Sequence, residues 1–179
     1  MIASPPTMKN AWHGDMRAFG RMKILIVDDE PLNVALLEDM LSEVGYKQVR
    51  SVTDSRLAVA TCSTFAPDLL LLDLMMPHVD GLSILHSLRS AGEEVFLPVI
   101  VLTADASEET KRAALGAGAT DFLLKPFDHT EVLLRIANLL EMRRLHIQLD
   151  TQRAALEDAL RERSLELREA HVNLENARV

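Results

Sequence analysis

The sequence has one cysteine, Cys62, among its 179 residues, and aromatic side chains make up only 4% of it. A single thiol excludes an intramolecular disulfide, so a reducing compartment fits best. No apolar run approaches the roughly 20 residues that a membrane-spanning helix needs. Positive charge is scarce, because 19 lysine and arginine residues stand against 27 acidic ones and the net charge is −8. We therefore expect a cytoplasmic protein that binds neither membranes nor, non-specifically, nucleic acids.

Short apolar runs alternate with amphipathic helical stretches from Lys23 onward, which is typical of βα units around a parallel sheet. We expect strands over residues 23–28, 48–52, 68–73, 99–103 and 120–124, and helices over 32–44, 55–64, 82–90 and 107–115. The first, third and fourth strands are almost continuously apolar, as strands covered on both faces must be. The second is polar enough to lie at an edge. The pattern predicts an α/β fold with a doubly wound, five-stranded parallel sheet.

The last predicted helix begins near Asp128, where Glu131 completes a capping box, and no proline or glycine follows to end it. A heptad pattern continues along this helix, and nine of its twelve a and d positions are apolar. These positions are Leu139, Met142, His146, Leu149, Arg153, Leu156, Leu160, Arg163, Leu167, Ala170, Leu174 and Ala177. About 50 residues at 1.5 Å each give a rod of roughly 70 Å, whose stripe one small domain cannot bury. We expect a flexible arm over residues 1–21, a folded domain over 22–140, and a homodimeric coiled coil over 141–179.

Polar side chains follow four of the five predicted strands at the point where each strand ends. Asp28 and Asp29 close the first strand, while Asp73, Thr103 and Lys125 close the third, fourth and fifth. The carboxyl ends of parallel strands meet at one crevice, so these groups should become neighbours. Clustered carboxylates suit a hard divalent ion such as Mg²⁺, which also accepts phosphate oxygens. A paired acid alone would be more simply a helix cap, but the joint pattern predicts a phosphoryl-accepting site.

Four segments that carry these residues resemble the receiver domain of bacterial two-component response regulators. The segments are ILIVDDEP, LLLLDLMMPHVDG, VIVLTA and DFLLKPF, and the resemblance covers about residues 23–140. It implies a flavodoxin-like sheet with strand order 2-1-3-4-5. It also implies a sensor histidine kinase or phosphotransfer protein as partner, and phosphorylation as the switch.

The resemblance assigns the acceptor and the metal ligands. Asp73 would be the phosphoacceptor, whose carboxylate attacks a phosphohistidine and forms an acyl phosphate. Asp29 and Asp73 would bind Mg²⁺ directly, Asp28 would act through water, and the backbone carbonyl of Met75 would complete the set. The ion would offset repulsion between the incoming anion and the acidic pocket. Because the Met75 side chain cannot orient an attacking water, the phosphorylated state should hydrolyse slowly.

The resemblance also assigns the groups that sense the phosphoryl group. Lys125 would supply a compact cation for the phosphoryl oxygens, and Thr103 would donate its hydroxyl to one of them. Phe122 would be the switch aromatic, which turns inward when that hydroxyl is drawn toward the phosphate. Pro126 resembles the cis-proline junction of the family, and Asp105 adds a negative charge near the mouth of the site.

Other functional classes remain open. The segment RERSLELREAHVNL is similar to the linker helix that joins receivers to HD-GYP phosphodiesterase or GGDEF cyclase domains. The alternative is therefore a regulatory part of a longer enzyme, and a reading frame that continues past Val179 would discriminate the two. A haloacid-dehalogenase phosphatase also uses an aspartate nucleophile with Mg²⁺, but it needs a second acid two residues after the nucleophile, where this chain has Met75, so we set that class aside. Residues 141–179 mix arginine and glutamate almost evenly, whereas a basic region that binds the phosphates of DNA is rich in positive charge. We therefore do not expect this segment to bind nucleic acid. This chain offers no separate catalytic domain, only Mg²⁺-dependent self-phosphorylation from a phosphodonor.

Overall fold

The computed structural model describes residues 20–90 and 96–176, except for the side chains of residues 172 and 174–176. The arm expected over residues 1–21 lies outside the described residues apart from its last two positions. The chain divides into two compact units, of which the first ends at Arg143 and the second begins at Arg144.

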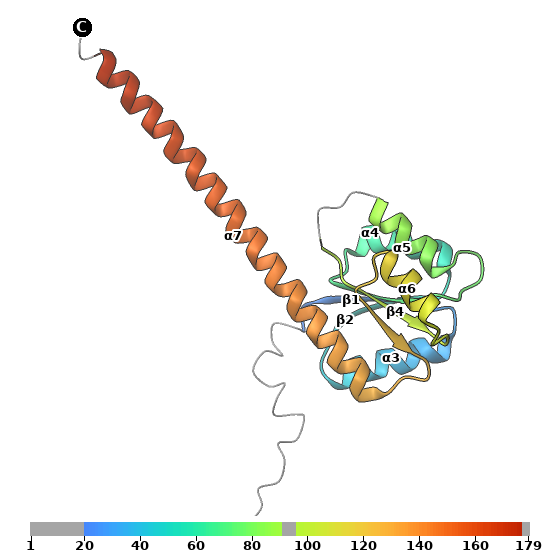
Figure 1. The fold of residues 1–179 in the computed structure, drawn as a ribbon. Helices are drawn as coiled ribbons and strands as arrows, with labels where there is room; N and C mark the ends of the chain where they lie inside the picture. The colour runs from blue at the N-terminus through green and yellow to red at the C-terminus, as the bar shows by residue number, and fades with distance from the viewer. Residues whose placement is uncertain (1–19, 91–95, 177–179) are drawn as a thin grey trace, which may run out of the picture. The chain divides into compact units, whose positions relative to one another are not determined.

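A five-stranded parallel sheet forms the centre of the first unit (Figure 1). Its strand order is β2-β1-β3-β4-β5, which confirms the predicted flavodoxin-like order with the polar second strand at an edge. The strands are β1 (Lys23–Val27), β2 (Gln48–Val52), β3 (Leu69–Asp73), β4 (Val99–Thr103) and β5 (Asp121–Leu124). Every residue of β3 and β4 is buried, because helices cover both faces of these strands.

Helices cover both faces of the sheet (Figure 1). Ile24 and Ile26 join the core cluster on one face, whereas Leu25 and Val27 join the cluster on the other, as the alternation of a strand requires. The first face is covered by α3 (Pro31–Glu43) and the beginning of α7 (His129–Asn176). The second is covered by α4 (Ala58–Phe65), α5 (Gly81–Ser90) and α6 (Glu108–Gly116).

The helix predicted over residues 55–64 is divided in the structure. A short 3₁₀ turn, η1 (Ser55–Leu57), precedes α4. The side chain of Asp54 caps this turn by accepting a hydrogen bond from the backbone N–H of Arg56. The bounds of the other predicted strands and of the helices predicted over 32–44, 82–90 and 107–115 lie within one residue of the observed ones, and β2 and β4 match at both ends.

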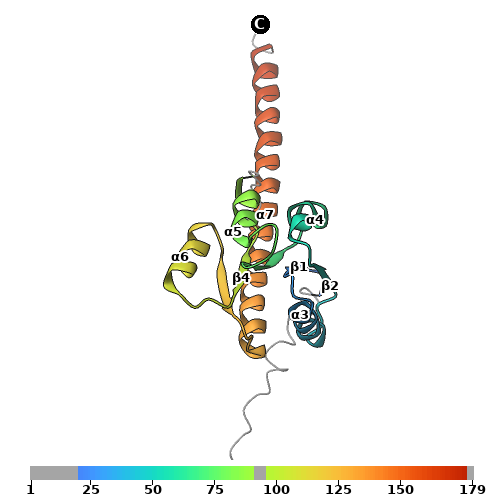
Figure 2. The same cartoon turned by 90° about the vertical axis from the view of Figure 1, so that its right-hand side faces the viewer.

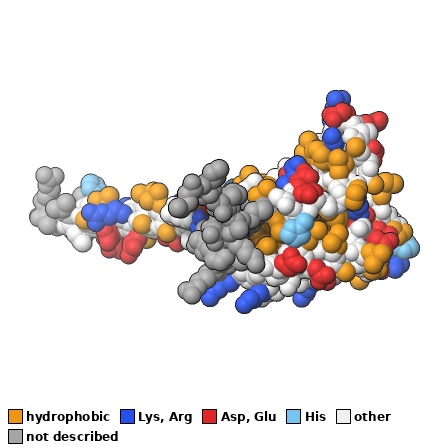
Figure 3. Space-filling model, turned by 90° about the horizontal axis from the view of Figure 1, so that it is seen from below, with side chains coloured by type: hydrophobic (Ala, Val, Ile, Leu, Met, Phe, Trp, Pro, Cys, Tyr) orange, Lys and Arg blue, Asp and Glu red, His pale blue; other side chains and the backbone are white. Residues whose placement is uncertain are grey.

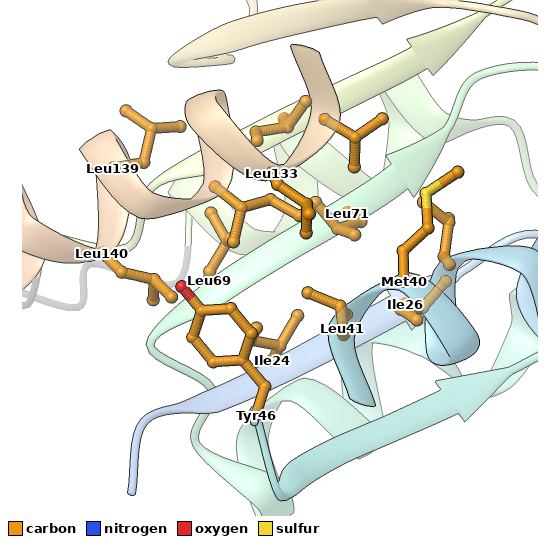
Figure 4. Close-up of a cluster of buried hydrophobic side chains, with 14 of the residues drawn as sticks. Ile24, Ile26, Met40, Leu41, Tyr46, Leu69, Leu71, Leu133, Leu139 and Leu140 are labelled. Carbon is orange, nitrogen blue, oxygen red and sulfur yellow. The ribbon is translucent and has the colours of Figure 1, made fainter. Parts of the chain in front are cut away.

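The beginning of α7 is part of the core of the first unit. Val132, Ile136 and Leu140 are fully buried, and Leu140 lies beside Tyr46 and Leu69 in the cluster drawn in Figure 4. Leu139, the first position of the heptad pattern, is buried in the same cluster and lies within the range predicted for the folded domain, residues 22–140. The heptad pattern includes this core-facing stretch because periods of 3.5 and 3.6 residues coincide over a few turns.

In the second unit, α7 continues as an unbroken helix (Figure 2) to residue 176. Leu149 is 63% exposed, and Leu156, Leu160 and Leu167 are each 61% exposed. Apolar side chains recur among arginine and glutamate side chains along this helix (Figure 3). Within residues 20–90 and 96–176, no helix has the length and apolar character that crossing a membrane requires.

Candidate functional site

Three carboxylates meet at the carboxyl ends of β1 and β3. The register of these strands pairs Val27 with Leu72, so Asp28 and Asp29 leave β1 beside the end of β3, where Asp73 lies. One carboxylate oxygen from each of Asp28, Asp29 and Asp73 lies within 4.8 Å of the other two. The structure therefore brings together the three acids that the sequence analysis selected.

Asp28 is the most enclosed of the three acids. Its side chain is fully buried, and one of its oxygens accepts a hydrogen bond of 2.9 Å from the backbone N–H of Glu30. The side-chain amide of Asn33, in the first turn of α3, donates to both oxygens at 3.3 and 3.2 Å. These donors hold the carboxylate in one orientation. Asn33 was not among the site residues predicted from the sequence.

Lys125 joins two of the acids. Its Nζ lies 2.8 Å from Asp28 Oδ2 and 3.1 Å from Asp73 Oδ1. Burial alone would lower the pKa of Lys125, but the hydrogen bond to Asp28 and the charges of Asp73 and Asp28 outweigh it and raise the pKa. The ammonium group therefore stays charged at neutral pH. The peptide bond between Lys125 and Pro126 is cis.

The surroundings of Asp73 oppose the ionisation of its side chain. Burial raises the pKa of its carboxyl group, and the charge of Asp28 adds to this effect, whereas the charge of Lys125 works against it. The backbone N–H of Met75 lies 3.4 Å from Asp73 Oδ1, and the Met75 side chain is exposed. Asp29 is half-buried and forms the more solvent-accessible part of the cluster.

The donor set of this cluster fits a hard divalent cation. With all groups ionised, three carboxylates and one ammonium leave two uncompensated negative charges, and oxygen ligands are what Mg²⁺ prefers. The residues that could hold the ion are Asp28, Asp29 and Asp73. The crowded charges are costly without such an ion.

Thr103 ends β4 beside the cluster and is buried. Its hydroxyl oxygen accepts a hydrogen bond of 3.0 Å from the backbone N–H of Asp105. The Asp105 carboxylate accepts hydrogen bonds from the hydroxyl of Thr110 and from the backbone and hydroxyl of Ser107, and these bonds lower its pKa. The negative charge of Asp105 is thus engaged with the start of α6. A pocket of about 190 Å³ lies beside Thr103, Met75 and Asp105.

Phe122 lies on β5, next to the strand that carries Thr103. The register pairs Val101 with Phe122 and Thr103 with Leu124. The Phe122 ring is half-buried and packs against the core cluster under α4, α5 and α6. The Nζ atom of Lys111 lies 5.0 Å from the centre of the ring. The aromatic ring is therefore placed between the core and the surface of α6.

Comparisons with known proteins agree with this geometry. A family model described as the response regulator receiver domain matches residues 24–137. The probable transcriptional regulatory protein TcrX of Mycobacterium tuberculosis is 39% identical over 125 residues, which cover 69% of this chain and 52% of that protein. This chain spans about half the length of the curated relatives that it matches.

Solved structures give the same assignment. A putative response regulator from Chloroflexus aurantiacus is 33% identical with a TM-score of 0.63, over 67% of this chain and 98% of that one. A putative two-component system response regulator/GGDEF domain protein is 26% identical with a TM-score of 0.68, over 74% of this chain and 54% of that one. The chain belongs to the family of response regulator receiver domains.

Proposed function

We propose that this chain is a phosphoacceptor switch in which Asp73 receives a phosphoryl group from a sensor histidine kinase or a phosphotransfer protein. One observation carries the proposal. Asp28, Asp29 and Asp73 place carboxylate oxygens within 4.8 Å of one another, and Lys125 bridges two of them at 2.8 and 3.1 Å. Such a concentration of negative charge lowers the stability of the fold. Clusters of this kind occur at functional sites, and here the charges would bind a cation that accompanies a phosphoryl group.

The proposed transfer is a direct displacement. A carboxylate oxygen of Asp73 attacks the phosphorus atom of a phosphohistidine, the phosphorus–nitrogen bond breaks, and the leaving imidazole takes a proton from solvent. The product is an acyl phosphate on Asp73. Lys125 Nζ, already 3.1 Å from Asp73 Oδ1, can pair with the phosphoryl oxygens, and the Thr103 hydroxyl can donate to one of them.

Mg²⁺ would be held directly by Asp29 and Asp73, and through water by Asp28. The backbone carbonyl of Met75 would be a further ligand. When bound, the ion supplies positive charge that offsets the repulsion between the acids and the phosphoryl group. The chain's own groups do the positioning. Asn33 and the backbone of Glu30 fix the orientation of Asp28, and Lys125 fixes that of Asp73.

The response to phosphorylation would pass through Thr103 and Phe122. Movement of the Thr103 hydroxyl toward the phosphoryl group would break its bond with the Asp105 backbone and vacate space beside β4. The half-buried ring of Phe122 would then turn inward, away from the cation of Lys111. The surface formed by α6 and β5 would change as a result.

The distal part of α7 would form a parallel homodimeric coiled coil that transmits this change. Leu149, Leu156, Leu160 and Leu167 are more than half exposed, and they follow the heptad spacing that a second copy of the helix would bury. His146, Arg153 and Arg163 interrupt the seam, which would keep the dimer marginal and sensitive to the receiver. We place this switch in the cytoplasm, where the thiol of Cys62, which forms no disulfide, stays reduced.

One comparison favours a second candidate. The response regulator/GGDEF domain protein aligns with 74% of this chain at a TM-score of 0.68. In that alternative the chain is the N-terminal regulatory part of an enzyme such as a cyclic-di-GMP phosphodiesterase or diguanylate cyclase, and α7 is its linker. A reading frame that continues past Val179 into a catalytic domain would favour this candidate, and a stop codon directly after Val179 would exclude it.

The proposed function is tested with a small phosphodonor. Acetyl phosphate with Mg²⁺ should add one phosphoryl group to the wild type, as intact-mass spectrometry reports, and none to Asp73→Asn. Asp39→Asn is the matched control, because Asp39 lies exposed on α3, and it should be labelled like the wild type. Equal labelling of wild type and Asp73→Asn would overturn the assignment. Calorimetric titration should also show that Asp29→Ala weakens Mg²⁺ binding sharply.

A further inference from the structure

Ser55 makes a buried connection that the proposed function does not use. Its side chain lies in η1, and the residue is 3% exposed. The hydroxyl donates a hydrogen bond of 2.6 Å to the backbone carbonyl of Pro77 and accepts one of 3.1 Å from the backbone N–H of Val79. One side chain therefore joins η1 to the loop that follows Asp73, across 22 and 24 residues of sequence.

The residue between these two contacts has an unfavourable backbone conformation. His78 has a φ of 73°, in the left-handed region that residues with a Cβ seldom adopt. The N–H of Val79 also donates to the carbonyl of Pro77 at 3.0 Å, which closes a tight turn of three residues around His78. Such a conformation persists only where surrounding contacts hold it, and Ser55 contacts the residues on both sides of it.

The same loop begins at the proposed acceptor. Gly81 donates a backbone hydrogen bond of 3.0 Å to Leu74, and a Cβ at Gly81 would collide with the carbonyl oxygen of Asp73. The loop is thus closed at its base by Leu74 and Gly81 and held at its tip by Ser55. Met75, whose backbone carbonyl is the proposed fourth metal ligand, lies between these two points.

We propose that Ser55 is a positioning residue for the acceptor loop, because its hydroxyl holds the strained turn at His78 and thereby fixes the Met75 carbonyl beside Asp73. This inference rests on the proposed function of the site. Loss of the hydroxyl would let the turn at His78 relax, and the loop would lose its preorganised geometry. Removing a group that orients a metal ligand typically weakens metal affinity about tenfold or more, and we expect about five- to tenfold here because Ser55 acts through the backbone.

The test is Mg²⁺ affinity measured by calorimetric titration of Ser55→Ala. Its matched control is Ser63→Ala, which removes an exposed hydroxyl from the neighbouring α4. Ser55→Ala should raise the dissociation constant of Mg²⁺ about five- to tenfold, and Ser63→Ala should leave it unchanged. Ser55→Cys, which keeps the size of the side chain but bonds weakly, should also weaken binding and covers the case in which Ser55→Ala does not fold.

Rescue separates positioning from a general loss of stability. Glycine adopts positive φ without strain, so His78→Gly alone should bind Mg²⁺ like the wild type. Added to Ser55→Ala, His78→Gly should recover at least half of the lost Mg²⁺ affinity, measured on the logarithm of the dissociation constant. If Ser55→Ala and Ser55→Cys bind Mg²⁺ like the wild type, or if His78→Gly gives no recovery, the inference is overturned while the proposed function stands. If the wild type binds no Mg²⁺, the proposed metal site fails and this inference fails with it.

Discussion

Replacing Lys125 by methionine should destabilise the metal-free protein strongly. Methionine keeps an unbranched side chain of similar length. It removes the ammonium group, whose Nζ atom lies 2.8 Å from Asp28 Oδ2 and 3.1 Å from Asp73 Oδ1. The side chain of Asp28 is fully buried and that of Asp73 is only 6% exposed. Water therefore cannot take the place of the lost ammonium group beside these carboxylates unless the site opens. Both charges would remain buried, close together and uncompensated.

The magnitude follows from the burial. Removing one partner of a buried ion pair costs about 3–5 kcal/mol, because the remaining charge stays desolvated. The side chain of Lys125 is 18% exposed, which places this case near the lower end, at about 3 kcal/mol. For a domain of this size, that loss lowers the melting temperature by roughly 10 °C.

The cost should depend on pH in a defined direction. Burial already holds the pKa of Asp73 above that of an unfolded aspartate, and loss of the Lys125 charge would raise it further. Ionisation therefore opposes folding increasingly as pH rises from about 4 through the pKa of the folded state. The deficit of Lys125→Met should be largest near pH 7 and should shrink as the pH falls toward and below about 4, where the Asp73 carboxyl group becomes protonated in the unfolded state as well as in the folded state.

Urea unfolding of the metal-free protein at a series of pH values measures this deficit. Lys47→Met is the matched control, because Lys47 is exposed, and it should change the free energy of unfolding by less than about 0.5 kcal/mol. Adding Asp73→Asn to Lys125→Met should recover part of the loss. A deficit below about 1 kcal/mol at pH 7, or one that does not vary with pH, would refute the reasoning.

Three further predictions concern other parts of the chain. Without metal, Asp73→Asn should raise the free energy of unfolding at pH 7 and flatten its dependence on pH between about 4 and 7, because the variant has no charge to bury; urea unfolding checks this. Burial raises the pKa of Tyr46, the only tyrosine, to about 12. Its phenolate absorbance should therefore appear near pH 12 in the folded protein and near pH 10 in urea. Between these two values the free energy of unfolding should fall by roughly 1.4 kcal/mol per pH unit. Leu160→Glu with Leu167→Glu should weaken a dimer in light scattering with and without phosphodonor, whereas Leu165→Glu, on the opposite side of the heptad, should not; a wild-type monomer at micromolar concentration would contradict the constitutive dimer.

The sequence predicts the sheet and the convergence of the acids because both depend on local patterns. Apolar runs of strand length give β1, β3 and β4, and the polar residue after each run falls at the shared edge of the sheet. The strand order needs the family resemblance, since periodicity alone does not say which strands are neighbours. Within that order, Asp28, Asp73 and Lys125 meet as the sequence analysis expected.

Other features could not be predicted because their partners are distant in sequence or their periods overlap. Ser55 contacts a loop more than 20 residues away, and nothing in its neighbourhood marks it as different from another helix-start serine. Asn33 follows Asp28 by five residues in the segment DDEPLN. That spacing does not by itself show that the Asn33 amide donates to the Asp28 carboxylate, as the observed hydrogen bonds do. Leu139 satisfies both the core-facing period and the seam period, and only its burial separates them.

The claim that Asp73 accepts a phosphoryl group is tested most directly by mapping the acyl phosphate. Borohydride reduces an acyl phosphate on an aspartate to homoserine, which peptide mass spectrometry then places in the sequence. After treatment with acetyl phosphate and Mg²⁺, homoserine should appear at position 73 and should be absent when the donor is omitted. Homoserine at Asp28 or Asp29 instead, or none at any position in a protein that binds Mg²⁺, would contradict the account.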